Sequence, residues 1–190
     1  GLTAKYFPFP LDHERLWERL ESVPLAGSTV LNVPPEDLLL YLCVHGSKHL
    51  WGRLLWVCDV AELIRSHQEM DWDRVMSQAR AHGSERMLFL GLSLASKLLG
   101  LEIPKEVSMM QSDQTVKLLA THVLEGLFRE KRTRGFTEKP FFHLRMRERL
   151  RDKVRLAYHY ALNYFLIAVS PNTLDQAIMP LPGSFSFLYY

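Results

Sequence analysis

The sequence has few of the features that mark specialised protein classes. Only two of its 190 residues are cysteines, Cys43 and Cys58, which provide neither a disulfide framework nor a Cys-x-x-Cys metal or redox pair. The longest nearly uncharged apolar stretch, 156–169, is shorter than the roughly 20 residues that span a bilayer. No signal peptide is visible. These absences exclude a secreted disulfide scaffold and predict a cytoplasmic protein with no membrane partner.

The chain also lacks a strong net charge and any repeat at a fixed period. Its 23 Lys and Arg face 21 Asp and Glu, and 47% of its residues are hydrophobic. A chain of this length and composition can bury one core without disulfides or metals. Intrinsic disorder and collagen-like repeats are therefore excluded.

Strand-like alternation of useful length is missing, whereas apolar residues recur at helical spacing along most of the chain. A brief extended piece is expected at 30–33. Helix-start and helix-stop residues divide the rest. The expected helices begin at Asp12, Pro35, Leu54, Asp71, Ser84 and Ser112, and a long helix spans 142–169. We predict an all-α fold, a single helical domain of six to eight helices over 1–190. Its expected parts are an extended, proline-bearing N-terminal segment within 1–34, motif-bearing helices at 35–100, and further helices with a tail at 101–190.

The polar stretch 45–53 follows the first strongly apolar helix, and its two glycines predict a helix end and a tight connection. His45 and His49 are four residues apart, so both imidazoles share one face if the helix continues through them. Zinc needs three or four ligands, and no third ligand follows at a recognised spacing. A metal-dependent hydrolase using His45 and His49 therefore stays an alternative to a structural or ligand-contacting pair.

Asp59 lies within the apolar run of the next predicted helix. A carboxylate buried there needs a donor, and Lys48, Arg53 or one of the two histidines is within plausible reach. Two interpretations stay open. The group is either a polar cluster at a cleft with a perturbed carboxylate, or a structural ion pair that fastens two helices.

Asp71 and Asp73 match the letters of the D-x-D pattern with which nucleotidyltransferases hold metal ions. That use needs a strand, where alternate side chains point the same way, and normally a Gly-Ser pair shortly before it. Here the pair Gly46-Ser47 lies 24 residues upstream, with a predicted helix between. We interpret both aspartates as helix caps, so the sequence lacks this catalytic motif.

Positive charge is concentrated in one stretch. Residues 129–155 contain eleven Lys and Arg against four acids. Such a stripe can contact phosphates or nucleic acid, although Glu148 and Asp152 interleave with the cations as on a solvated helix face. A helical binding module that contacts nucleic acid or an acidic partner through 129–155 is thus a second alternative.

Three segments together resemble the bacterial family called uncharacterised nucleotidyltransferases. They are PEDLLLYLCVHGSKHLW at 35–51, LLWVCDV at 54–60 and DWDRV at 71–75, and the likeness continues through GLSLA at 91–95 and LLG at 98–100 to Leu181-Pro182. The resemblance implies a catalytic half with the nucleotidyltransferase fold first in the chain and a helical half after it. The present sequence corresponds to the helical half.

The resemblance also implies a function and partners. The helical half would complete a substrate or nucleotide pocket while being catalytically incomplete alone, and Mg²⁺ would belong to the catalytic half. The expected partners are that half and a nucleotide. The binding residues that match the family pattern are His45, Lys48, His49, Arg53 and Asp59, and no catalytic or metal residue is assigned to this chain.

Overall fold

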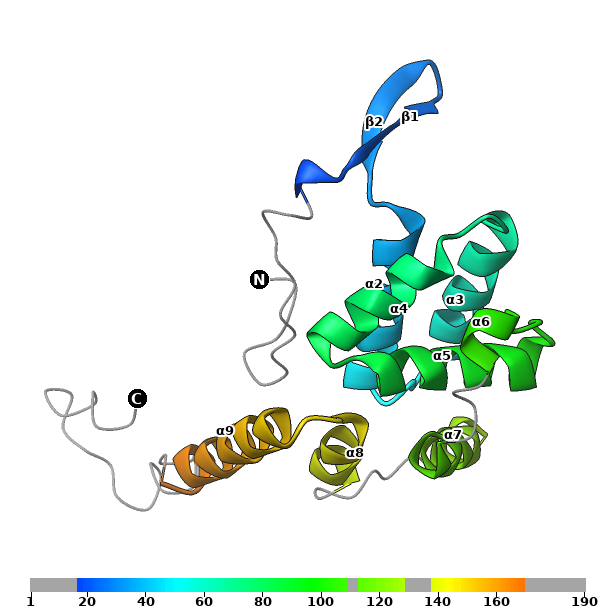
Figure 1. Cartoon of the computed structure of the whole chain (residues 1–190). Coiled ribbons are helices and arrows are strands. Elements are labelled where there is room, and N and C mark those ends of the chain that lie inside the picture. Colours follow the sequence, from blue (N-terminus) through cyan, green and yellow to red (C-terminus); the bar gives the residue numbers. More distant parts are fainter. Residues whose placement is uncertain (1–16, 109–112, 129–137, 170–190) are drawn as a thin grey trace, which may run out of the picture.

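The computed structural model describes residues 17–108, 113–128 and 138–169, most of which are helical, as the sequence predicts (Figure 1). The predicted proline-bearing start and the C-terminal tail lie largely outside these ranges. The elements are β1 (Glu21–Leu25), β2 (Ser28–Asn32), α2 (Pro35–Lys48), α3 (Leu54–Ser66), α4 (Trp72–His82), α5 (Glu85–Leu99), α6 (Lys105–Ser108), α7 (Gln114–Leu127), α8 (Glu138–Met146) and α9 (Leu150–Val169). No helix of the described residues is long and apolar enough to cross a membrane.

Most helix boundaries follow the predicted signals. Pro35 is the first residue of α2, where its missing N–H costs no hydrogen bond. Gly83 and Gly100 end α4 and α5 with φ of 62° and 65°, a left-handed conformation that glycine adopts without strain. The cap of α7 is Asp113, whose carboxylate accepts from the Thr115 N–H at 2.7 Å. The prediction of Ser112 at this position is wrong by one residue.

A β-hairpin precedes the helices. The extended piece predicted near Val30 is confirmed as part of β2, but its antiparallel partner β1 was not predicted, because Pro24 and Glu21 are unusual strand residues. Ala26 and Gly27 join the strands with φ of 47° and 81°. Two positive φ angles define the type I′ turn, whose twist suits a two-residue hairpin.

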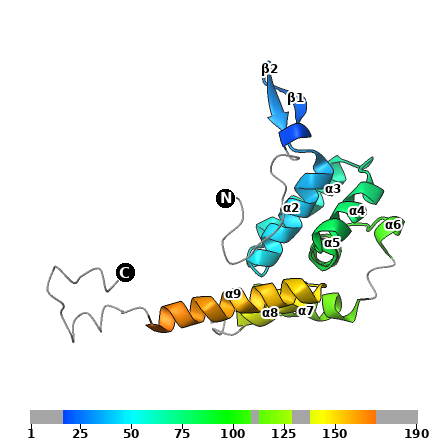
Figure 2. The ribbon, with the colours of Figure 1, turned by 60° about the vertical axis from the view of Figure 1, so that its left-hand side comes forward.

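The helices form two layers. Helices α2, α3, α4 and α5 pack into one group, and α7, α8 and α9 lie across its lower side (Figures 1 and 2). Buried apolar side chains from α2 through α8 form one continuous core. The core therefore contains side chains from both layers. Helix α2 also contacts α8, although the two belong to different layers.

The prediction of one long helix over 142–169 is wrong, because the helix is broken between α8 and α9. Arg86 of α5 accounts for the break. Its guanidinium donates to the carbonyls of Arg145 and Arg147 at 3.2 and 3.3 Å, and its backbone N–H donates to Glu148 Oε1 at 2.6 Å. The two bonds to carbonyls take the place of the backbone bonds that these carbonyls would accept in a continuous helix.

Candidate functional site

The C-terminal end of α2 has a strained backbone. The Trp51 N–H donates to the Gly46 carbonyl at 2.7 Å and the Leu50 N–H to the Ser47 carbonyl at 3.1 Å, which is the hydrogen-bond pattern of a Schellman cap. Leu50 and Trp51 have φ of 54° and 49°, a region that costs an L-residue about 1–2 kcal/mol. Burial of both side chains compensates for this strain, since they are 2% and 0% exposed.

The Trp51 indole lies against two glycines, one on α2 and one on α5. A Cβ atom at Gly46 would lie 2.7 Å from the ring, and one at Gly91 would lie 3.0 Å from the ring and 2.6 Å from Cys43 Sγ. The helix end predicted within 45–53 is confirmed, because α2 ends in this stretch. Gly46 is inside α2, which continues to Lys48, and it is needed there for close approach of the indole.

Four rings gather where α2 ends and α3 begins, and we call Tyr41, His45, His49 and Trp56 the ring cluster. His45 lies in the last turn of α2 and His49 is its C-cap residue, and their rings lie on the same side with centroids 4.8 Å apart. Trp56 of α3 lies 5.4 Å from each imidazole, and Tyr41 lies 6.0 Å from His45. All four side chains are partly exposed, so the cluster offers aromatic faces at the surface.

Cations surround the ring cluster. The Arg53 guanidinium lies 5.8 Å from the Trp56 ring centroid, in cation–π range. Burial is the main cause that lowers the pKa of both His45 and His49, and Lys48 lowers both further. The imidazoles are therefore neutral near pH 7, and the positive charge here comes from lysine and arginine.

Asp59 is half-buried in α3 and closer to solvent than the sequence suggests. Within the described residues its carboxylate forms no ion pair with Lys48 or Arg53, so the structural ion pair kept open above is not formed there. The negative charge of Asp59 acts to raise the pKa of His45, but burial lowers that pKa by more, so the net shift is downward. All five sequence-predicted residues thus lie at this one junction.

Sequence reasoning missed four residues that build the junction. Tyr41 and Trp56 lie within the segments that resemble the family, but only the ring contacts in the structure show that they adjoin the two histidines. Lys139 of α8, within the basic stretch, lowers the pKa of His49. The buried His143 of α8 holds the end of α2 from below. Nothing in the local sequence brings α8 to α2, since these helices are about 90 residues apart.

His143 joins α2, α8 and α9. Its Nε2 lies 3.0 Å from the Lys48 carbonyl and its Nδ1 lies 2.6 Å from the Tyr160 hydroxyl. A carbonyl can only accept, so Nε2 carries the proton and the hydroxyl donates to Nδ1. Burial lowers the pKa of His143 to about 3. A neutral His143 therefore satisfies one of the last carbonyls of α2 beneath the ring cluster.

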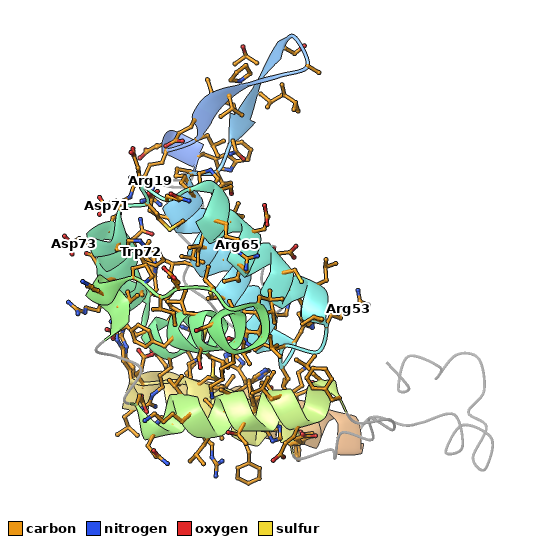
Figure 3. All side chains as sticks on the ribbon, turned by 90° about the vertical axis from the view of Figure 1, so that its right-hand side faces the viewer. Arg19, Arg53, Arg65, Asp71, Trp72 and Asp73 are labelled. Atoms are coloured by element: carbon orange, nitrogen blue, oxygen red, sulfur yellow. The ribbon has the colours of Figure 1, made fainter. Side chains whose placement is uncertain are left out.

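Neither set of candidate metal ligands that the sequence offers, the pair His45 and His49 or the pair Asp71 and Asp73, belongs to a metal site within the described residues. Asp71 caps α4, accepting from the Arg74 N–H at 3.0 Å, which confirms the cap interpretation for this residue. Asp73 is not the cap; it lies in the first turn of α4. Asp71 and Asp73 lie together, well away from Arg53 (Figure 3). Among residues 17–108, 113–128 and 138–169, no three His, Cys, Asp or Glu side chains are arranged to hold a metal ion. The pair His45 and His49 thus gains no third ligand from the described part of the chain.

The basic stretch is described only from residue 138 onward, and part of it is used in packing. Arg147 is 2% exposed, and Arg149 donates to the Arg80 carbonyl. Glu148 accepts from the Arg86 N–H, and burial raises its pKa. The prediction of a solvated face is therefore wrong at these positions. Arg151 remains exposed on α9.

The fold and the junction define a class of protein, a two-layered helical domain with neutral rings and cations at one surface. The family described as uncharacterised nucleotidyltransferase matches residues 2–100 of the chain, and the chain belongs to this family. The match ends at Gly100, so it includes the ring cluster but excludes α7, α8 and α9. No curated protein and no solved structure shows significant similarity to the chain.

Proposed function

We propose that this chain is the helical half of a bacterial, cytoplasmic nucleotidyltransferase-related protein, and that its ring cluster completes the pocket for the nucleotide or acceptor. The family membership supports the reaction class. The observation that carries the proposal is the coincidence of partly exposed aromatic rings with Lys48, Arg53 and Lys139 at one junction. Stacking faces and cations together suit a planar base and its phosphates.

In this proposal each predicted residue has a defined part. Trp56 and His49 offer faces on which a base stacks, and their neutral rings avoid repulsion from neighbouring cations. Lys48 and Arg53 offset phosphate charge. Asp59 acts on His45, because its charge favours a proton on that imidazole. Chemistry on the nucleotide, and the Mg²⁺ it requires, belongs to the catalytic half with which this chain is proposed to act.

The proposal is tested by titrating ATP into the purified chain over the millimolar range and following the imidazole and indole resonances by NMR. We expect the signals of His45, His49 and Trp56 to shift together. Replacing Trp56 by Leu removes a stacking face worth about 1–3 kcal/mol, which weakens binding roughly five- to 150-fold. Arg53→Gln should weaken it by severalfold.

The matched control is Lys97→Gln, which removes one exposed cation from α5, away from the junction. It should leave the affinity unchanged apart from a small electrostatic effect that salt screens. Equal affinities for wild type, His49→Ala, Asp59→Ala, Trp56→Leu and Arg53→Gln would contradict the proposal and leave these residues with a structural role only.

A further inference from the structure

The hairpin of β1 and β2 projects from the helical group at the N-terminal end of α2 (Figure 1). Every residue of β2 and all but Val23 of β1 are exposed. Leu25 and Leu31 are 62% and 63% exposed, although both are large apolar side chains. A two-stranded hairpin of this kind is marginally stable in water, whereas a sheet of three or more strands with an apolar face is stable.

The two outer edges of the hairpin differ. The two-residue turn makes Leu25 and Ser28 a hydrogen-bonded pair, and pairs alternate from there. Pro24 therefore belongs to a pair whose backbone groups point outward, and it has no N–H to offer. Proline is a usual means of blocking an edge strand. The outer edge of β1 is thus closed to further pairing.

The outer edge of β2 is open. Its sequence, STVLN, contains neither a charge nor a proline, the devices that usually block an exposed edge. The same alternation directs the N–H and C=O groups of Thr29 and Leu31 outward. Among the described residues the sheet consists of β1 and β2 alone, so these four groups have no strand partner there.

We propose that β2 pairs with β2 of a second copy of this chain, antiparallel and about a two-fold axis at Val30. In this register Thr29 faces Leu31 of the other copy and Leu31 faces its Thr29. All four outward backbone groups are then bonded, which is the self-complementarity that a two-fold interface requires. Val30 faces Val30 in a non-hydrogen-bonded pair, where side chains approach closely.

The product is a four-stranded sheet that cannot grow further. Val23 and Val30 of both copies line one face, which supplies the apolar surface that a lone hairpin lacks. Both outer strands are then β1, and Pro24 blocks each of them. The pairing therefore closes at a dimer. Because a pair of five-residue strands is a small contact compared with stable interfaces, which bury about 1,200 Å² or more, we expect a dimer that dissociates on dilution in the micromolar to submillimolar range.

Sedimentation equilibrium of the 190-residue chain over that range tests the proposal. The average mass of the wild type should rise toward that of a dimer. Val30→Lys and Val30→Glu each place like charges opposite one another at the axis, which should weaken association by up to about fivefold. An equimolar mixture of the two variants should regain the dimer, since opposite charges then face each other. Ser22→Lys, on β1, is the matched control and should associate like the wild type.

Amide exchange measured by NMR reports the register directly. The Thr29 and Leu31 amides should become more protected as protein concentration rises, while the Val30 amide, bonded within the hairpin, should be protected throughout. A close contact between the α-protons of Ser22 and Leu31 confirms that the hairpin is intact in each variant. A wild type that stays monomeric, dimerisation unaffected in both Val30 variants, or exchange at Thr29 and Leu31 independent of concentration would each overturn the proposal.

Discussion

The buried imidazole of His143 should make the stability of this protein depend on acidity. Burial holds its pKa at about 3, against an ordinary value of 6.5. As the pH falls below 6.5, the unfolded chain takes up a proton at this residue and the folded chain does not. Unfolding is then favoured. The contribution of the neutral His143 to the free energy of unfolding is therefore fully present above pH 6.5 and is lost progressively as the pH falls toward 3.

The size of the effect follows from the two pKa values. One pKa unit corresponds to about 1.4 kcal/mol. A pH of 4.5 is two units below the ordinary pKa of 6.5, so His143 is protonated in the unfolded chain. In the folded chain, where its pKa is about 3, the imidazole is still neutral. The free energy of unfolding should thus be about 3 kcal/mol lower at pH 4.5 than at pH 7.5 on account of His143 alone. Other titrating groups add their own dependence, so a variant must isolate this one.

His143→Gln is the isolating variant, because glutamine keeps a donor for the Lys48 carbonyl but does not titrate. Urea denaturation at pH 7.5 and 4.5 should show a wild-type loss about 3 kcal/mol larger than that of the variant. Tyr160→Phe removes the hydroxyl hydrogen bond, worth about 1 kcal/mol, and should keep most of the pH dependence because burial causes it. Parallel losses in wild type and His143→Gln would refute the reasoning, as would an imidazole resonance of His143 that titrates above pH 5.

Two further predictions concern packing and capping. Gly91→Ala should destabilise the fold by about 1–3 kcal/mol or more, because the added Cβ would overlap Cys43 Sγ. Gly126→Ala is the control: its Cβ meets nothing within 4 Å, so it should raise the melting temperature slightly. Equal shifts of the two melting temperatures in calorimetry would contradict the packing account. Asp71→Ala should lower the free energy of unfolding, measured by urea denaturation, by about 1 kcal/mol, because the cap of α4 is lost. Asp73→Ala should lower it by only about a few tenths of a kcal/mol. Equal losses in the two variants would argue against Asp71 as the cap.

Much of the helical architecture could be predicted from the sequence because its signals are local. Pro35 starts a helix and Gly83 and Gly100 end helices, since each residue's backbone preference acts within one turn. The i, i+4 relation of His45 and His49 is likewise a local property of an α-helix. Identification of the family depended on the same contiguous segments.

Other features arise from contacts between residues far apart in the chain. The helix break before α9 depends on Arg86 of α5, and the strained end of α2 depends on burial of Trp51 against Gly91. Sequence patterns do not contain these contacts, so the prediction of a continuous helix over 142–169 was wrong and the positive φ angles of Leu50 and Trp51 were not predicted. The hairpin was missed because it depends on pairing between two short strands, one of which contains a proline.

The candidate site divides in the same way. The sequence alone indicated five candidate residues and their position at the ends of two helices, because those residues lie within 15 positions of one another in one recognisable motif. Only the tertiary structure placed Trp56 against both imidazoles, brought Lys139 and His143 from α8, and made the histidines neutral through burial. The physical reason is that local backbone preference sets helices, whereas burial and charge at a site depend on every segment that packs around it.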